Sequence, residues 1–129
     1  MASVSFVVPG KPVSVNAAYK RRNLANGGKG LMLSPEARSF KSSVAIYALL
    51  ARQRATWPAL TAVVAVNLTI VTWNCRHDAD APVKLLQDAL EGILYVRDSV
   101  VRSVTAARAK DGGKPRIEVT VEAHEEGPR

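Results

Sequence analysis

The chain has 129 residues, 47% of them hydrophobic and 22% charged, which is the composition of an ordinary folded domain and not of a disordered segment. No apolar run reaches the roughly 20 residues needed to span a bilayer, and residues 1–12 lack the basic start and long apolar run of a secretory signal. The single cysteine, Cys75, excludes a disulfide-stapled scaffold. We therefore expect one cytoplasmic domain over residues 1–129.

Charge is distributed unevenly along the chain. Lysine and arginine number 18 against 11 acids, for a net charge of +7. Residues 1–60 hold nine of the bases and a single acid, Glu36, whereas residues 61–129 are close to neutral. A strongly basic half is typical of proteins that bind a polyanion such as nucleic acid. The alternative is a basic protein kept soluble by its charge, or one that meets anionic lipid.

The first half of the chain predicts a strand, a loop and a helix. Apolar residues recur at every second position over 4–8, before Pro9-Gly10, which predicts a half-buried strand. Residues 9–33 are rich in proline, glycine, asparagine and bases and predict a long basic loop. Ser34-Pro35-Glu36 is typical of a helix start, with Ser34 as N-cap. This helix is expected to end near Arg54, and its apolar face is expected to hold Phe40, Val44, Tyr47 and Ala51.

The second half predicts a strand, a helix and two further strands. Residues 62–72 are almost continuously apolar and β-branched, as expected for a central strand covered on both faces. The later elements are expected to be a helix over 80–91 that stops at Gly92, a strand over 100–109, a turn at 111–113, a strand over 117–123 and a frayed tail over 124–129. This order predicts an α+β fold with a single mixed sheet and two main helices packed on it.

Three acids of the second half form a candidate metal site. Asp78 and Asp80 follow the apolar run over 62–72, and Asp98 precedes the next predicted strand. If the helix between these acids packs back on the sheet, the segment before the helix and the segment after it are expected to lie close together. Like charges at contact distance are costly unless a cation offsets them, and oxygen ligands favour Mg²⁺ or Mn²⁺ over Zn²⁺. Such a site suits phosphodiester hydrolysis.

Lys84 lies one helical turn after Asp80 and one turn before Asp88. It is therefore a candidate to hold a scissile phosphate or assist the leaving group, with Asp88 steadying it. Simpler interpretations stay open at this point: the two acids before the helix as capping residues, Lys84 and Asp88 as a surface ion pair, and Asp98 as a turn residue.

The same segment resembles the core of the RusA family of Holliday junction resolvases. The matching pieces are RHDAD at 76–80, Lys84, LQDALEG at 86–92, Tyr95 and RDSVV at 97–101. The pieces PGKPVSVN at 9–16, SPEAR at 34–38 and PRIEV at 115–119 resemble the strand end, helix start and closing strand of that family. The landmarks occur in order and span about residues 4–122.

The resemblance implies a small homodimeric endonuclease, often encoded by phages and prophages, that acts in the bacterial cytoplasm. It implies Mg²⁺-dependent cleavage of four-way DNA junctions in recombination and repair, by paired symmetric nicks. By matching position, Asp78, Asp80 and Asp98 would be the metal-binding catalytic acids and Lys84 the catalytic lysine. A twofold dimer suits a reaction that cuts two strands.

Several positions depart from the family pattern. Ala81 stands where the family usually has asparagine, and Pro82 follows it. Arg97 replaces one acid of a usual pair, and Val100 stands near the place of a usual glutamine. Loss of the asparagine side chain is expected to weaken support for the metal ligands. The four proposed catalytic positions are intact, which favours an active enzyme.

The candidate DNA-binding residues are expected to contact phosphates and to supply affinity without selecting a sequence. They are Lys11, Asn16, Lys20, Arg21, Arg22, Lys29 and Arg76. A solvated loop is the simpler interpretation of the bases between 9 and 33. Two other functions stay open: a non-catalytic DNA-binding module with the same fold, and a basic RNA-associated protein.

Overall fold

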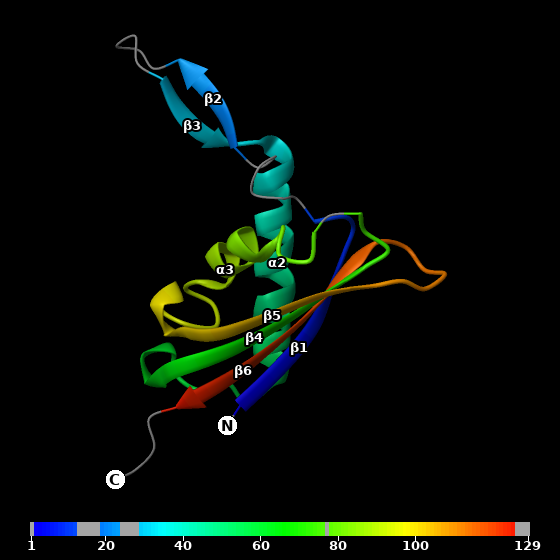
Figure 1. The fold of residues 1–129 in the computed structure, drawn as a ribbon. Coiled ribbons are helices and arrows are strands. Elements are labelled where there is room, and N and C mark those ends of the chain that lie inside the picture. Colours follow the sequence, from blue (N-terminus) through cyan, green and yellow to red (C-terminus); the bar gives the residue numbers. More distant parts are fainter. Residues whose placement is uncertain (1, 13–18, 24–28, 77, 126–129) are drawn as a thin grey trace.

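The described residues form a four-stranded mixed sheet with two α-helices packed on one of its faces, and a separate two-stranded sheet (Figure 1). The computed structural model describes residues 2–12, 19–23, 29–76 and 78–125. The strand order is β1-β6-β4-β5, with antiparallel pairs except for the parallel pair of β4 and β5. The expected α+β class, with one mixed sheet and two helices, is confirmed. No helix in these described ranges is long and apolar enough to cross a membrane.

The elements follow the predicted order, with one addition. The strands are β1 (Ala2–Pro9), β2 (Tyr19–Asn23), β3 (Lys29–Leu33), β4 (Val63–Trp73), β5 (Val101–Ala109) and β6 (Arg116–Glu125). The helices are α2 (Pro35–Arg54) and α3 (Val83–Leu90), and two short 3-10 turns are η1 (Leu60–Ala62) and η2 (Asp98–Val100). The strand pair β2–β3 lies beyond the N-terminal end of α2, away from the four-stranded sheet (Figure 1).

The hydrophobic core lies between one face of the sheet and both helices. Alternate strand residues such as Phe6, Leu68 and Val119 are buried in a cluster that also holds Phe40 of α2 and Leu86 of α3. No helix of the described residues covers the opposite face of the sheet. The expectation that 62–72 is covered on both faces is therefore wrong: β4 is central, but every second side chain over 67–73 is only partly buried.

Helix α2 begins as predicted. The Ser34 hydroxyl is buried and accepts a hydrogen bond from the backbone N–H of Ala37 at 3.1 Å, which satisfies one of the free donors of the first turn. The buried face holds Ala37, Phe40, Val44 and Ala48. Tyr47 was predicted on this face but is 36% exposed, because the stripe advances by four residues from Val44 and so passes through Ala48.

The segment predicted as a basic loop contains an antiparallel strand pair. In β2 and β3, Tyr19 pairs with Leu33 and Arg22 pairs with Gly30. The prediction of a loop over all of 9–33 is thus corrected over 19–23 and 29–33, whereas residues 10–12 do lie outside helices and strands. A strand of mostly basic residues lacks the apolar alternation by which strands are predicted, although the Asn26-Gly27 pair is a common hairpin signal.

Two element ends also differ from expectation. Helix α3 begins at Val83 and not at Asp80, since residues 78–82 form turns in which the Ala81 N–H donates to the Asp78 carbonyl at 3.0 Å. Pro82 disfavours helical geometry at the residue before it, which delays the helix. Strand β6 continues through Glu125, so residues 124 and 125 belong to the sheet and not to a frayed tail; residues 126–129 lie outside the described ranges.

Candidate active site

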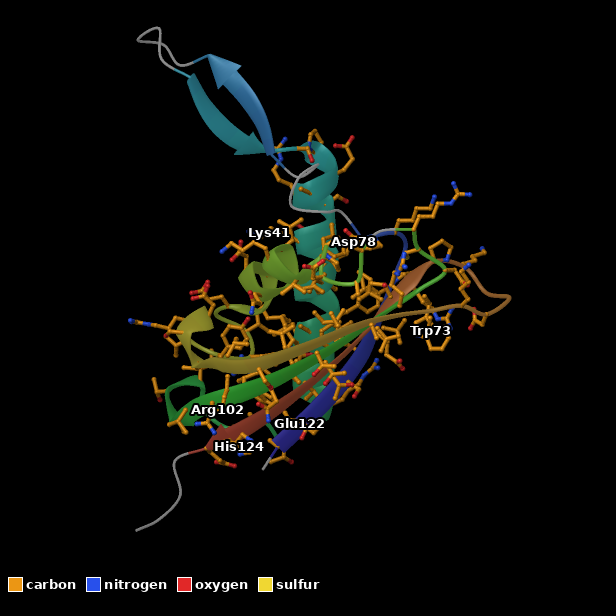
Figure 2. The ribbon with its side chains drawn as sticks, in the orientation of Figure 1. Lys41, Trp73, Asp78, Arg102, Glu122 and His124 are labelled. Atoms are coloured by element: carbon orange, nitrogen blue, oxygen red, sulfur yellow. The ribbon has the colours of Figure 1, made fainter. Side chains whose placement is uncertain are left out.

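Asp78 and Asp80 lie on the exposed turn that joins β4 to α3. In Figure 2, Asp78 lies where the chain passes from the end of β4 toward the start of α3. Both carboxylates are solvent-exposed, and the Val83 N–H donates to the carbonyl of Asp80 at 3.1 Å, so these acids occupy the turn without capping the helix through their side chains. Two hard oxygen donors, two residues apart, are thus available to a cation.

Lys84 follows on the first turn of α3. Its ammonium lies 3.3 Å from a carboxylate oxygen of Asp88, and the two side chains are 53% and 22% exposed. An exposed i,i+4 pair of this kind contributes little to stability, about 0.3–0.5 kcal/mol. The predicted pairing of Lys84 with Asp88 is therefore present, and it holds the ammonium on the exposed side of α3, one turn from Asp80.

Asp98 lies after α3, at the far end of the connection from β4 to β5. Strands β4 and β5 run parallel, with Val66 beside Val101 and Trp73 beside Ala109. Asp98 begins η2, just before β5, whereas Asp78 and Asp80 come after the end of β4. Figure 1 shows α3 returning across the sheet between these two ends. In a strand-helix-strand unit with parallel strands, the exit turn and the return turn necessarily lie at opposite ends of the strands.

The expectation that the segment before α3 and the segment after it lie close together is therefore wrong for a single chain. The seven residue steps from Val66 to Trp73 separate the two ends of the parallel β4–β5 ladder by about 23 Å. The eight residues of α3 alone cover about 12 Å. Within residues 2–12, 19–23, 29–76 and 78–125, no three His, Cys, Asp or Glu side chains are grouped so that they could hold a metal ion.

The surroundings of Asp98 are acidic. The buried Tyr95 hydroxyl donates to the carbonyl of Gln87 at 2.8 Å. Burial raises the pKa of Tyr95, and the negative charges of Glu91, Asp98 and Asp88 raise it further. Asp98 thus shares its neighbourhood with acids of the C-terminal part of α3 and of the turn after it.

The candidate DNA-binding residues fall into three groups. Lys11 and Arg76 are exposed. The backbones of Lys20, Arg21 and Arg22 belong to β2 and that of Lys29 to β3. Asn16 lies outside the described residues.

A polar cluster that the sequence did not predict joins the ends of β4 and β5. Asn74 has a φ of 60°, and its amide donates to the Asp111 carboxylate at 2.7 Å and to the Gly113 carbonyl at 3.0 Å. Arg116 donates to the same carboxylate at 2.6 Å and lies 4.7 Å above the Trp73 ring. Hydrogen bonds from Arg116, then from Asn74 and Gly113, hold the pKa of Asp111 well below its usual range. The signal in the sequence was Asp111-Gly112-Gly113, which predicts only a turn.

Comparison with protein families identifies the family to which this chain belongs. The family model for endodeoxyribonuclease RusA matches residues 9–122, which include β4, α3, β5 and all four predicted catalytic positions. The chain belongs to the RusA family. The resemblance drawn from the sequence is confirmed, and the fold described above, with its parallel crossover, is that of a member of a DNA endonuclease family. Comparison with curated proteins gave no match.

Proposed function

We propose that this protein is a Mg²⁺-dependent endonuclease that resolves four-way DNA junctions by paired nicks, as a homodimer, in phage or bacterial recombination and repair. The observation that carries the proposal is the RusA match over residues 9–122 together with intact Asp78, Asp80, Asp98 and Lys84. The net charge of +7 fits a polyanionic substrate.

The exposed carboxylates of Asp78 and Asp80 suit a hard dication that keeps part of its water shell. Bound Mg²⁺, with Mn²⁺ as a substitute, would supply an activated water and offset the charge of the scissile phosphate. Lys84, one turn further on, is assigned to the phosphate or the leaving oxygen. Asp88 contacts the Lys84 ammonium at 3.3 Å and serves as its positioning residue.

The third acid of the site is proposed to come from a second copy of the chain. Carboxylates that share one Mg²⁺ lie about 2 Å from the ion and therefore within about 4 Å of one another. Asp98 begins η2 at the opposite end of the β4–β5 pair from Asp78 and Asp80. A twofold dimer that sets the turn after β4 of one copy beside η2 of the other completes two equivalent sites.

The surface of α2 offers an apolar stripe for such a contact. Ile46, Leu49 and Leu50 are 59%, 44% and 41% exposed and lie at positions i, i+3 and i+4, so they share one side of the helix. Large apolar side chains grouped on a surface are typical of an interface. We assign this stripe to the dimer contact.

Incubation of the purified protein with an end-labelled four-way junction tests the proposal. We expect nicks on two opposed strands in Mg²⁺ and none in EDTA. Asp78→Asn, Asp80→Asn and Asp98→Asn should each lower the nicking rate roughly 100-fold or more while junction binding survives. The matched control is Glu118→Gln, which changes an exposed acid on the face of β6 that points away from the hydrophobic core; this variant should nick normally. Nicking that persists in EDTA, or in all three Asp variants, contradicts the proposal.

A second candidate is a non-catalytic DNA-binding module with the same fold. It is favoured by one observation: the described part of a single chain does not gather the three acids. It predicts junction binding without Mg²⁺-dependent nicking, so the same assay separates the two functions.

A further inference from the structure

An open pocket of about 450 Å³ lies where β4 and β5 both end. Its lining residues are Cys75, Arg76, Arg108, Ala109 and Lys110. Three of these five side chains are cations, and none is an acid. Two of the lining residues, Cys75 and Arg76, belong to the segment that leads from β4 to Asp78. They are therefore two to five positions in the sequence from the proposed metal-binding acids Asp78 and Asp80.

The charge around the pocket is positive. Lys11 lies near enough to lower the pKa of the Cys75 thiol, against the larger effect of burial, which raises it. The nearest acid in sequence is Asp111, but its carboxylate accepts hydrogen bonds from Asn74, Gly113 and Arg116. The negative charge of Asp111 is therefore already offset by these donors.

The walls of the pocket are fixed by backbone and side-chain contacts between the two strand ends. The Asn74 N–H donates to the Ala109 carbonyl at 2.9 Å, and the Asp111 N–H donates to the Asn74 side-chain oxygen at 2.9 Å. These bonds tie the segment that carries Cys75 and Arg76 to the segment that carries Arg108 and Lys110. The backbone positions that carry the three cations are thus fixed before an anion binds, which lowers the ordering cost of binding.

We infer that this pocket, formed by Cys75, Arg76, Arg108, Ala109 and Lys110, binds a phosphodiester of the DNA backbone next to the one that is cut. The inference rests on the proposed function and adds two residues, Arg108 and Lys110, to its DNA-binding surface. Arginine donates paired hydrogen bonds to phosphate oxygens, and lysine adds a point charge. Such contacts set the position of the strand and carry no sequence preference. The pocket thus positions the strand for the acids beyond β4.

Salt dependence of binding tests this inference without cleavage. Junction affinity is measured in EDTA between low and moderate salt for the wild type and for Arg108→Gln, Lys110→Gln and the double variant. Each lost phosphate contact should lower the log–log salt slope by about 0.9, and the double variant by about twice that amount. Arg54→Gln, at the exposed C-terminal end of α2, is the charge-matched control and should leave the slope unchanged.

The single cysteine gives a direct measure of occupancy. Cys75 is partly exposed in the pocket, so a thiol reagent should label it slowly in the free protein and several-fold more slowly when the junction is bound. If the junction binds but neither the salt slope nor the labelling rate changes, the inference is wrong and the proposed function stands. If both change but no nick forms in Mg²⁺, the pocket is supported and the nuclease proposal fails. Absence of junction binding overturns both, and the same effects seen only with structured RNA overturn the assignment to DNA.

Discussion

Mixing two inactive variants distinguishes a site shared between two copies from a site within one chain. Asp78→Asn removes an acid after β4, and Asp98→Asn removes the acid before β5. In a heterodimer of the two, one shared site carries both substitutions and the other carries neither. The geometry of a single chain, with the acids at opposite ends of the β4–β5 ladder, therefore predicts that the mixture regains activity.

The size of the recovery follows from the pairing. If the copies exchange at random in an equal mixture, about half of the dimers are heterodimers, and each has one intact site of two. The mixture should then hold about one quarter of the wild-type number of sites. Because each heterodimer has a single working site, the product should be a junction nicked on one strand, without the paired nick of the wild type.

The assay is nicking of an end-labelled junction by co-expressed or co-refolded pairs, with each strand followed separately. The matched control pairs Asp78→Asn with Asp80→Asn, because both lie on the same turn and every dimer then has a defect in each site. This control should stay inactive. No recovery in the first mixture, or equal recovery in both, would refute the shared site.

Three further predictions concern stability and assembly. Ser34→Ala removes the hydroxyl that caps α2, so the free energy of unfolding measured by urea titration should fall by about 1 kcal/mol. The control variant Ser42→Ala, on the exposed side of the helix, should leave the free energy of unfolding nearly unchanged. The lowered pKa of Asp111 means that its bonds stabilise the folded state fully above the unfolded pKa of about 4, and that this stability is lost gradually as pH falls from there toward the lower folded pKa. Asp111→Asn should therefore lower Tm more at pH 7 than at pH 2, and equal differences at both pH values would contradict this. Ile46→Glu places a charge on the α2 stripe and should shift the protein from dimer to monomer in light scattering without loss of helical signal. Thr105→Glu, at an exposed position of β5 away from this stripe, should remain dimeric, and a dimeric Ile46→Glu protein would exclude this contact.

Elements with a strong local pattern were predictable from the sequence. The N-cap serine and the proline that follows it define the start of α2, and the alternation over 117–123 defines β6, because capping and side-chain period act within a few residues. The strand pair β2–β3 was missed since its first strand is mostly polar and basic. Tyr47 was misplaced because several apolar residues compete for one face of α2, and only packing against the sheet selects Ala48.

The residue types of the candidate site were evident in the sequence, because Asp78, Asp80, Lys84 and Asp98 carry the family resemblance that the RusA match confirms. Their spatial relation was not. It depends on whether β4 and β5 pair in parallel, a choice made by hydrogen bonds between residues more than 30 positions apart. The same pairing brings Arg76 beside Arg108 and Lys110 and creates the pocket at the strand ends. The types of side chain at the site can thus be read from the sequence. The distances between these side chains depend on pairing between residues far apart in the chain, which no short window of sequence contains.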